Sequence, residues 1–273
     1  MASTNENAAA RREKIFLTGA SSGIGRAAAE ELLVRGYEVW GTSRDVNRIA
    51  AMPSLHPVRL DLDERASIQE GFATALEEAG SFDVVINNAG SGHFGPAQLL
   101  TGEQIERLFQ TLVFAHLELC RLAIAAMRQQ ERGLIINVTS LAAELPVPYM
   151  AAYNAAKAAM ASFTMTMQLE IGPNIRLIDL QPGDICTSFN EAVQRSSADD
   201  ARLQRVWNVV DCNMKNAPKP QLVGRRLAEL IEHNNPPPRV IVGDFFQSKV
   251  APLIFRLLPQ SMRVWGLKRY YRL

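Results

Sequence analysis

The sequence predicts a single α/β domain, doubly wound around a mainly parallel sheet of seven strands. Short apolar runs typical of buried strands alternate along the chain with amphipathic stretches of helical length. A glycine-rich turn joins the first apolar run to the first helix. With 273 residues, of which 47% are hydrophobic, the chain has enough material for one large core, and no linker rich in Pro, Gly or Ser divides its middle.

The domain is expected over residues 14–244, between a disordered tail (residues 1–13) and a C-terminal extension (residues 245–273). The formal net charge of +1 argues against nucleic acid as a partner, because phosphate binding requires a basic surplus. No run of about 18 apolar residues predicts a transmembrane helix, and no secretory signal is found. The cysteines and histidines are too scattered for disulfides or a metal site, so a cytoplasmic protein without a metal is expected; they are Cys120, Cys186, Cys212, His56, His93, His116 and His233.

The first strand, residues 14–18, leads into a turn that contains Gly19, Gly23 and Gly25 and opens a helix. Glycines let backbone N–H groups approach a pyrophosphate, and the positive end of the helix dipole attracts it. The pattern therefore predicts a dinucleotide site, and the alternative is an ordinary tight turn between strand and helix.

The second strand, residues 37–42, ends at Ser43 and Arg44, where the chemistry of the cofactor is decided. An acidic residue here would bind the ribose hydroxyls of NAD, whereas a guanidinium accommodates the 2′-phosphate of NADP. The sequence therefore favours NADP over NAD. The alternative is that Arg44 is a solvated loop residue paired with Asp45.

The next strands carry polar residues at their carboxyl ends, where ligands bind in an open α/β sheet. The third strand, residues 58–60, leads to Asp61 and Leu62, and a covering helix follows over residues 64–79. The fourth, residues 82–86, delivers two carboxamides at Asn87 and Asn88, which are able to tie adjacent strands together. The fifth, residues 133–140, ends in Thr139 and Ser140, which should face opposite sides of the sheet.

A long helix is expected over residues 101–128, capped by Thr101, and another over residues 149–170. The second helix carries Tyr153 and Lys157, which lie one above the other on one face. A nearby ammonium favours the phenolate and would lower the pKa of the phenol, which suits it to exchange a proton. The alternative is a packed ring beside a solvated lysine.

The last strands are predicted at residues 175–180 and 239–242, and a helix lies between them over residues 220–233. Residues 188–218 are predicted to be a flexible substrate loop, with a flap at 196–200 and a short helix at 201–210. The extension is basic and apolar, with no acidic residue. It could cover an apolar substrate cleft, a neighbouring subunit or an anionic membrane surface, or dock as a helix on its own domain.

Three motifs, TGASSGIG at residues 18–25, NNAG at 87–90 and YNAAK at 153–157, resemble the classical short-chain dehydrogenase/reductase family. The likeness runs from about residue 14 to about residue 242 and implies a Rossmann-type fold. It implies catalysis by Ser140, Tyr153 and Lys157, with Asn87 lying along the dinucleotide. The implied cofactor site is Gly19, Ser21, Ser22, Gly23, Ile24, Gly25, Ser43, Arg44, Asp61, Leu62, Asn88, Ala89, Gly90, Tyr153, Lys157, Pro182, Gly183, Ile185 and Thr187.

One position departs from the family pattern: the asparagine that usually holds a relay water falls on Leu112, which has no donor or acceptor. A relay rerouted through His116, one turn further on, is a hypothesis, and a buried helix histidine is the alternative.

The resemblance implies an NADP(H)-dependent oxidoreductase that interconverts a carbonyl and a secondary alcohol, in a homodimer or homotetramer. The extension favours a lipophilic substrate such as a steroid, a retinoid or an acyl chain. A catalytically weak NADP sensor is the alternative, whereas a sugar-nucleotide epimerase would need a longer substrate domain.

Overall fold

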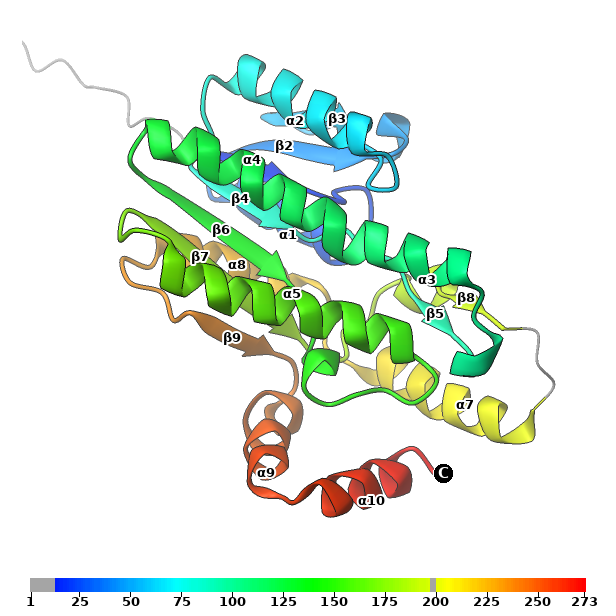
Figure 1. Ribbon diagram of the computed structural model, residues 1–273. Coiled ribbons are helices and arrows are strands. Elements are labelled where there is room, and N and C mark those ends of the chain that lie inside the picture. Colours follow the sequence, from blue (N-terminus) through cyan, green and yellow to red (C-terminus); the bar gives the residue numbers. More distant parts are fainter. Residues whose placement is uncertain (1–12, 197–199) are drawn as a thin grey trace, which may run out of the picture.

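The computed structural model describes residues 13–196 and 200–273 of the chain. The predicted N-terminal tail lies outside the described residues except for Glu13, and so does the middle of the predicted flap at residues 196–200. Figure 1 shows a sheet with helices on both of its faces and two further helices, α9 (Ala251–Leu257) and α10 (Gln260–Tyr270), beside its last strand.

Seven strands form the sheet in the order β3-β2-β1-β4-β6-β7-β9, and every pairing is parallel. This confirms the predicted fold class. The order reverses beside β1, so the chain leaves the carboxyl ends of β1 and β4 toward opposite faces of the sheet, and ligands bind at such a point in this architecture. The strands are β1 (Lys14–Leu17), β2 (Glu38–Ser43), β3 (Leu55–Arg59), β4 (Val84–Asn87), β6 (Gly133–Val138), β7 (Ile175–Pro182) and β9 (Arg239–Val242).

Two hydrophobic clusters lie on opposite faces of the sheet, because successive side chains of a strand point to opposite sides. In β1, Leu17 packs toward α1 (Gly23–Val34) and α8 (Gln221–Glu232), whereas Phe16 packs toward the other face. That other face is covered by α2 (Arg65–Ala79), α4 (Ala115–Gln129) and α5 (Ala151–Glu170). The buried strands therefore position their carboxyl ends within a rigid, doubly covered sheet.

The long helix predicted over residues 101–128 is present but contains an irregular turn. It consists of α3 (Gly102–Phe109), a π-helical turn (Gln110–Phe114) and α4, and Thr101 caps it as expected by accepting a bond from the backbone of Gln104. The whole helix, Gly102–Gln129, has 28 residues and is long and apolar enough to span a membrane by composition. Of its apolar window, 44% is buried inside the molecule, and a single helix of this kind is weak evidence for a membrane span.

Other elements differ from the prediction at their ends, where local signals are weak. Strand β3 begins at Leu55, before the expected start, and α5 begins at Ala151 because Tyr149 has a left-handed backbone (φ 63°). The predicted substrate loop contains α6 (Phe189–Ala192), a short strand β8 (Gln194–Arg195) paired with β5 (His93–Phe94), and α7 (Ala201–Asn216). Its mobility stays a prediction.

Candidate active site

The glycine-rich turn lies at the carboxyl end of β1 and packs closely against the loop after β4. Gly19 has a left-handed backbone (φ 75°), and a Cβ built there would lie 2.9 Å from that of Ala89. Thr18 joins the two loops, since its Oγ1 accepts from the backbone N of Asn88 at 2.8 Å and of Ala89 at 3.0 Å. The turn therefore brings backbone N–H groups to the start of α1, as a bound pyrophosphate requires.

Gly25 and Asn87 line neither of the two cavities described below, unlike the other predicted cofactor residues. A Cβ on Gly25 would lie 2.1 Å from the Gly19 carbonyl oxygen, so this glycine serves the close packing of α1 against the turn. Asn87 is fully buried and donates through Nδ2 to Asn137 Oδ1 on β6 at 2.8 Å. The expectation that Asn87 ties adjacent strands together is therefore confirmed, whereas its place along the dinucleotide stays a prediction.

A cavity of about 740 Å³ lies between the ends of β1, β2 and β3. Arg44 lines it, and so does Arg48, which the sequence reasoning missed although it lies only one short helical turn further along. The Asp45 carboxylate accepts from the backbone N of Asn47 at 3.0 Å, and Arg44 forms no ion pair with a described residue. The other predicted residues that line this cavity are Gly19, Ser21, Ser22, Ser43, Asp61, Leu62, Ala89 and Gly90.

A second cavity of about 240 Å³ brings together Ser140, Tyr153 and Lys157. It shares the lining residues Ser22 and Gly90 with the first cavity, so the two cavities adjoin each other. The other predicted residues that line it are Gly23, Ile24, Asn88, Pro182, Gly183, Ile185 and Thr187. The structure therefore gathers residues from five separate loops and helices at the carboxyl edge of the sheet.

The geometry of the three polar side chains follows from their elements. On α5, Lys157 Nζ lies 5.9 Å from the centroid of the Tyr153 ring and donates to the Val138 carbonyl oxygen at 3.0 Å. Ser140 follows β6 and hydrogen-bonds to the Tyr153 phenol, while its Oγ accepts from the backbone N of Ala142 at 3.1 Å. A substrate oxygen beside Tyr153 would therefore meet two hydroxyl groups.

Burial decides the protonation of this pair. The sequence predicts that Lys157 lowers the pKa of Tyr153, but burial raises the pKa of Tyr153 to about 12, and the bond from Ser140 opposes this only in part. Burial also lowers the pKa of Lys157 to about 8, against the attraction of Asp179. The prediction of a lowered phenol pKa is therefore wrong for this arrangement, because it ignored the desolvation of both groups.

Thr139 faces away from Ser140, as expected, and donates to the Asp179 carboxylate on β7. That carboxylate also accepts from Arg239 Nε at 3.0 Å and from Gln181 Nε2 at 2.9 Å. Burial nevertheless raises the pKa of Asp179. This network fixes the end of β7 beneath the residues that line the second cavity.

Leu112 lies within the π-helical turn and is fully buried. Its Cδ2 packs against Gly90, where a built Cβ would come within 3.1 Å. His116 is also buried, and burial lowers its pKa to about 3, so the imidazole is neutral at pH 7. Its Nε2 has no hydrogen-bond partner among the described residues, and His116 does not line the second cavity. The rerouted relay stays a hypothesis.

A third cavity of about 260 Å³ adjoins the second, and an apolar cleft covered by the extension was one of the alternatives that the sequence left open. Ser140, Ala142 and Gly183 line both, while the far wall of the third consists mostly of apolar residues of the C-terminal extension, together with Gln247 and Arg263. The extension also docks on its own domain, since Gln247 bonds to both the backbone N and the carboxylate of Asp184. The only signal in the sequence was the apolar character of residues 245–273.

Comparison with known proteins gives one family. A family model described as short chain dehydrogenase matches residues 13–198. A 3-ketodihydrosphingosine reductase from Bacteroides thetaiotaomicron is 29% identical over 272 residues, covering 94% of this chain and 97% of that protein. An NADPH-dependent 1-acyldihydroxyacetone phosphate reductase from Saccharomyces cerevisiae is 32% identical over 182 residues, covering 63% of this chain and 61% of that protein.

Solved structures share the fold. A short chain dehydrogenase/reductase from Burkholderia phymatum in complex with NAD superposes with a TM-score of 0.80 at 23% identity, covering 93% of this chain and 95% of that chain. A short-chain dehydrogenase from Streptomyces avermitilis gives 0.79 at 22% identity, covering 96% of this chain and 95% of that one.

Proposed function

The chain belongs to the short chain dehydrogenase family of oxidoreductases, and from this premise we propose that it reduces the carbonyl group of a lipophilic substrate with NADPH. The reverse reaction oxidises the secondary alcohol. The observation that carries the proposal is that the three cavities adjoin one another in order. The first contains the glycine-rich turn, the second contains Ser140, Tyr153 and Lys157, and the third is mostly apolar. Ser140 lines both the second and the third, so the reacting carbonyl is expected at this residue.

The roles of the side chains follow from their chemistry. When bound, the nicotinamide supplies or accepts the hydride. Tyr153 donates a proton to the carbonyl oxygen in reduction, and a pKa of about 12 keeps the phenol protonated for that task at neutral pH. Ser140 donates a hydrogen bond to the same oxygen. In oxidation Tyr153 must accept the proton, and Lys157 is the cation whose approach would stabilise the phenolate.

Preference for NADP is supported by Arg44 and Arg48, which both line the cavity at the end of β2. A guanidinium pairs well with a phosphate, whereas an acidic residue aimed at this cavity would repel it. Asp45 and Asp61 also line the cavity, but the Asp45 carboxylate accepts from the backbone N of Asn47 and the Asp61 carboxylate from the backbone N of Asp63. The yeast relative is named as NADPH-dependent, which agrees with this choice.

A lipid ketone is the substrate class that these features support. The wall formed by α9 and α10 is mostly apolar, although Arg263 also lines it, and the cavity is closed on another side by Ser140. The two relatives are named as reductases of a 3-ketodihydrosphingosine and of a 1-acyldihydroxyacetone phosphate. A lipid ketone fits this arrangement, with its keto group at Ser140 in the polar second cavity and its hydrocarbon chain in the adjoining third cavity.

The test is oxidation of NADPH, followed by absorbance, with ketones of increasing chain length. We expect kcat/KM to rise with chain length, and Tyr153→Phe to lower kcat by about a thousandfold, as loss of a general acid does. Tyr37→Phe is the matched control, since Tyr37 lies at the opposite end of the sheet, before β2. Unchanged turnover in Tyr153→Phe contradicts the proposal, and NADPH binding without consumption of any ketone favours the sensor.

A further inference from the structure

Positive charge is concentrated at the end of the chain. Residues 245–273 contain six basic side chains and no acidic one, whereas the whole chain has a net charge of only +1, so the rest is net negative. Arg256 contacts Glu144, and Arg263 donates to the Leu258 carbonyl oxygen. The other four form no ion pair with a described residue; they are Lys249, Lys268, Arg269 and Arg272.

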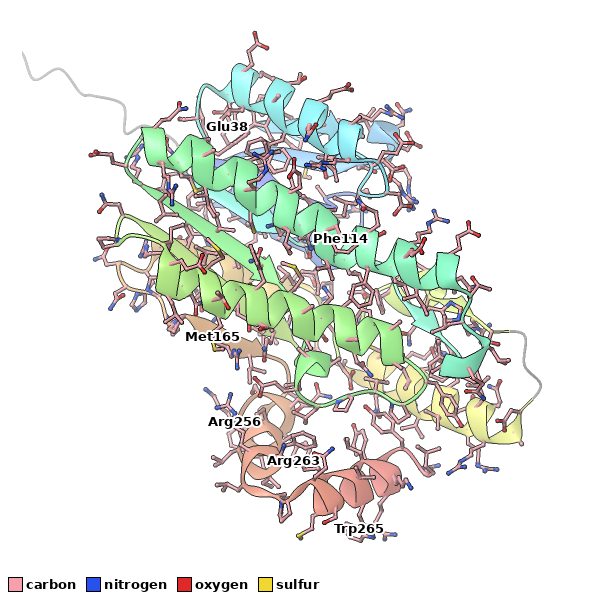
Figure 2. The ribbon with its side chains drawn as sticks, viewed as in Figure 1. Glu38, Phe114, Met165, Arg256, Arg263 and Trp265 are labelled. Carbon is pink, nitrogen blue, oxygen red and sulfur yellow. The ribbon has the colours of Figure 1, made fainter. Side chains whose placement is uncertain are left out.

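Large apolar side chains lie exposed on the same two helices. Leu257 on α9 is 77% exposed and Trp265 on α10 is 66% exposed. Figure 2 shows Trp265 on the side of α10 that faces away from the sheet, with Arg263 between the two helices. An exposed apolar surface with a basic surround is typical of a segment that lies on an anionic lipid interface, with its apolar side chains among the acyl chains.

The third cavity opens at this surface. Ile254 and Met262 both line the cavity and are 47% and 48% exposed, so they stand at its mouth. The opposite end of the cavity is formed by Ser140 and Gly183. A hydrocarbon chain that enters between α9 and α10 therefore has an apolar route to the residues proposed to act on the carbonyl.

We propose that α9 and α10 dock on the surface of an anionic lipid bilayer, and that the hydrocarbon chain of the substrate passes from the bilayer into the third cavity. The second part rests on the proposed function, whereas the first stands on charge and exposure alone. A bilayer of anionic lipids complements the basic extension. A second copy of the chain fits less well, because a two-fold interface through this surface would oppose the same cations.

Trp265 gives a direct readout of docking. The chain has three tryptophans, and the other two, Trp40 and Trp207, are buried, so a change in fluorescence on adding vesicles reports on Trp265. We expect a blue shift with phosphatidylcholine vesicles that contain phosphatidylglycerol, and a much weaker response with phosphatidylcholine alone. High salt should reverse the binding, because exposed charges are screened.

Two variants separate the contributions of charge and apolar surface, and cosedimentation with the vesicles measures both. Lys268→Ala with Arg269→Ala should weaken partitioning at least about tenfold. The matched control is Arg65→Ala with Arg128→Ala, which removes two exposed arginines from α2 and α4 and should leave it unchanged.

Leu257→Ser should also weaken partitioning, since less apolar area is buried on docking. Its matched control is Leu169→Ser, a leucine of still higher exposure on α5 that should leave partitioning unchanged. None of the four test and control positions on α9, α10 and α5 lines the second or third cavity.

Several results would overturn the proposal: no partitioning of the full chain, equal partitioning onto neutral and anionic vesicles, or equal loss in the controls. A fall in molar mass of Leu257→Ser by light scattering, without loss of vesicle binding, would assign the surface to a second copy. Reduction by NADPH of ketones of increasing chain length, without vesicles, is measured in parallel. Absence of reduction across the whole series would refute the proposed function and leave the vesicle result to stand by itself.

Discussion

Two guanidinium groups at the end of β2, those of Arg44 and Arg48, face the cavity expected to hold the adenosine part of the cofactor. Both residues are exposed and neither makes an ion pair with a described residue, so each guanidinium is available to a phosphate. Arg44 could be predicted from its place directly after a strand. Arg48 could not, because its approach to the cavity depends on the short turn that the Asp45 carboxylate caps.

Arg44→Ala should lower kcat/KM for NADPH by about 10- to 100-fold, the value of a lost hydrogen bond to a charged group. The same variant should change kcat/KM for NADH less than about twofold, since NADH lacks the 2′-phosphate. Steady-state kinetics with both cofactors measures this, with Arg65→Ala as the control. Equal losses with the two cofactors would show that Arg44 does not read the phosphate.

The pKa of Tyr153 could not be predicted from the spacing of Tyr153 and Lys157 alone. Tyr153 and Lys157 were found from their spacing, because four residues on a helix bring them to one face. The pKa of the phenol depends instead on burial by residues distant in sequence, among them Phe189, whose ring centroid lies 5.9 Å from that of Tyr153. The tie that Asn87 makes between strands could be predicted, but its partner Asn137 could not, since Asn137 lies on another strand.

At the scale of elements, Gln247 joins the C-terminal extension to the loop after β7. The π-helical turn Phe246–Val250 positions its amide, which accepts from the backbone N of Asp184 at 2.8 Å and donates to the carboxylate at 2.6 Å. Burial raises the pKa of Asp184, so this carboxyl depends on its partners. The C-terminal extension therefore forms one wall of the third cavity and also presents the exposed surface of α9 and α10.

Gln247→Ala should lower the free energy of unfolding by about 1–3 kcal/mol, because it leaves buried polar groups of Asp184 without a partner. It should also raise KM for the cofactor, since Gly183 lines the second cavity. Urea unfolding and steady-state kinetics test this against Ser248→Ala, whose hydroxyl bonds only within its own turn. Unchanged stability in Gln247→Ala would show that its two hydrogen bonds to Asp184 do not hold the extension on the domain.

Regular elements were predicted well because buried parallel strands leave a clear apolar signal, as in residues 82–86. The π-helical turn at Gln110–Phe114 was not, because nothing in its local sequence distinguishes it from an α-helix. The paths of α9 and α10 were also beyond prediction, since they are set by contacts with loops far away in the sequence, such as those of Arg256 with Glu144.

For the whole molecule, the buried Lys157 makes stability depend on pH. Its pKa falls from 10.5 to about 8 on folding, so between these values the unfolded chain holds a proton that the folded chain has lost. The free energy of unfolding therefore gains from this group as pH rises through that window. Below about pH 8 the folded protein must instead keep a buried ammonium.

Lys157→Met removes this dependence. The difference in unfolding free energy, variant minus original, should fall by up to about 3 kcal/mol between pH 8 and pH 10.5. Urea unfolding of both proteins at several pH values measures it, and other titrating groups cancel in the difference. A difference that stays constant over this range contradicts the lowered pKa.

The two ends of the described chain differ in what can be attached to them. Lys14 is the first residue of β1, so it lies at the amino ends of the strands, away from the glycine-rich turn. Tyr271, in contrast, is buried and lines the third cavity. Immobilising the protein on a chip through residues before Lys14 would therefore leave the apolar entrance open. A fluorescent fusion placed after Leu273 would crowd that entrance, and an assay built on it would underestimate both lipid uptake and turnover.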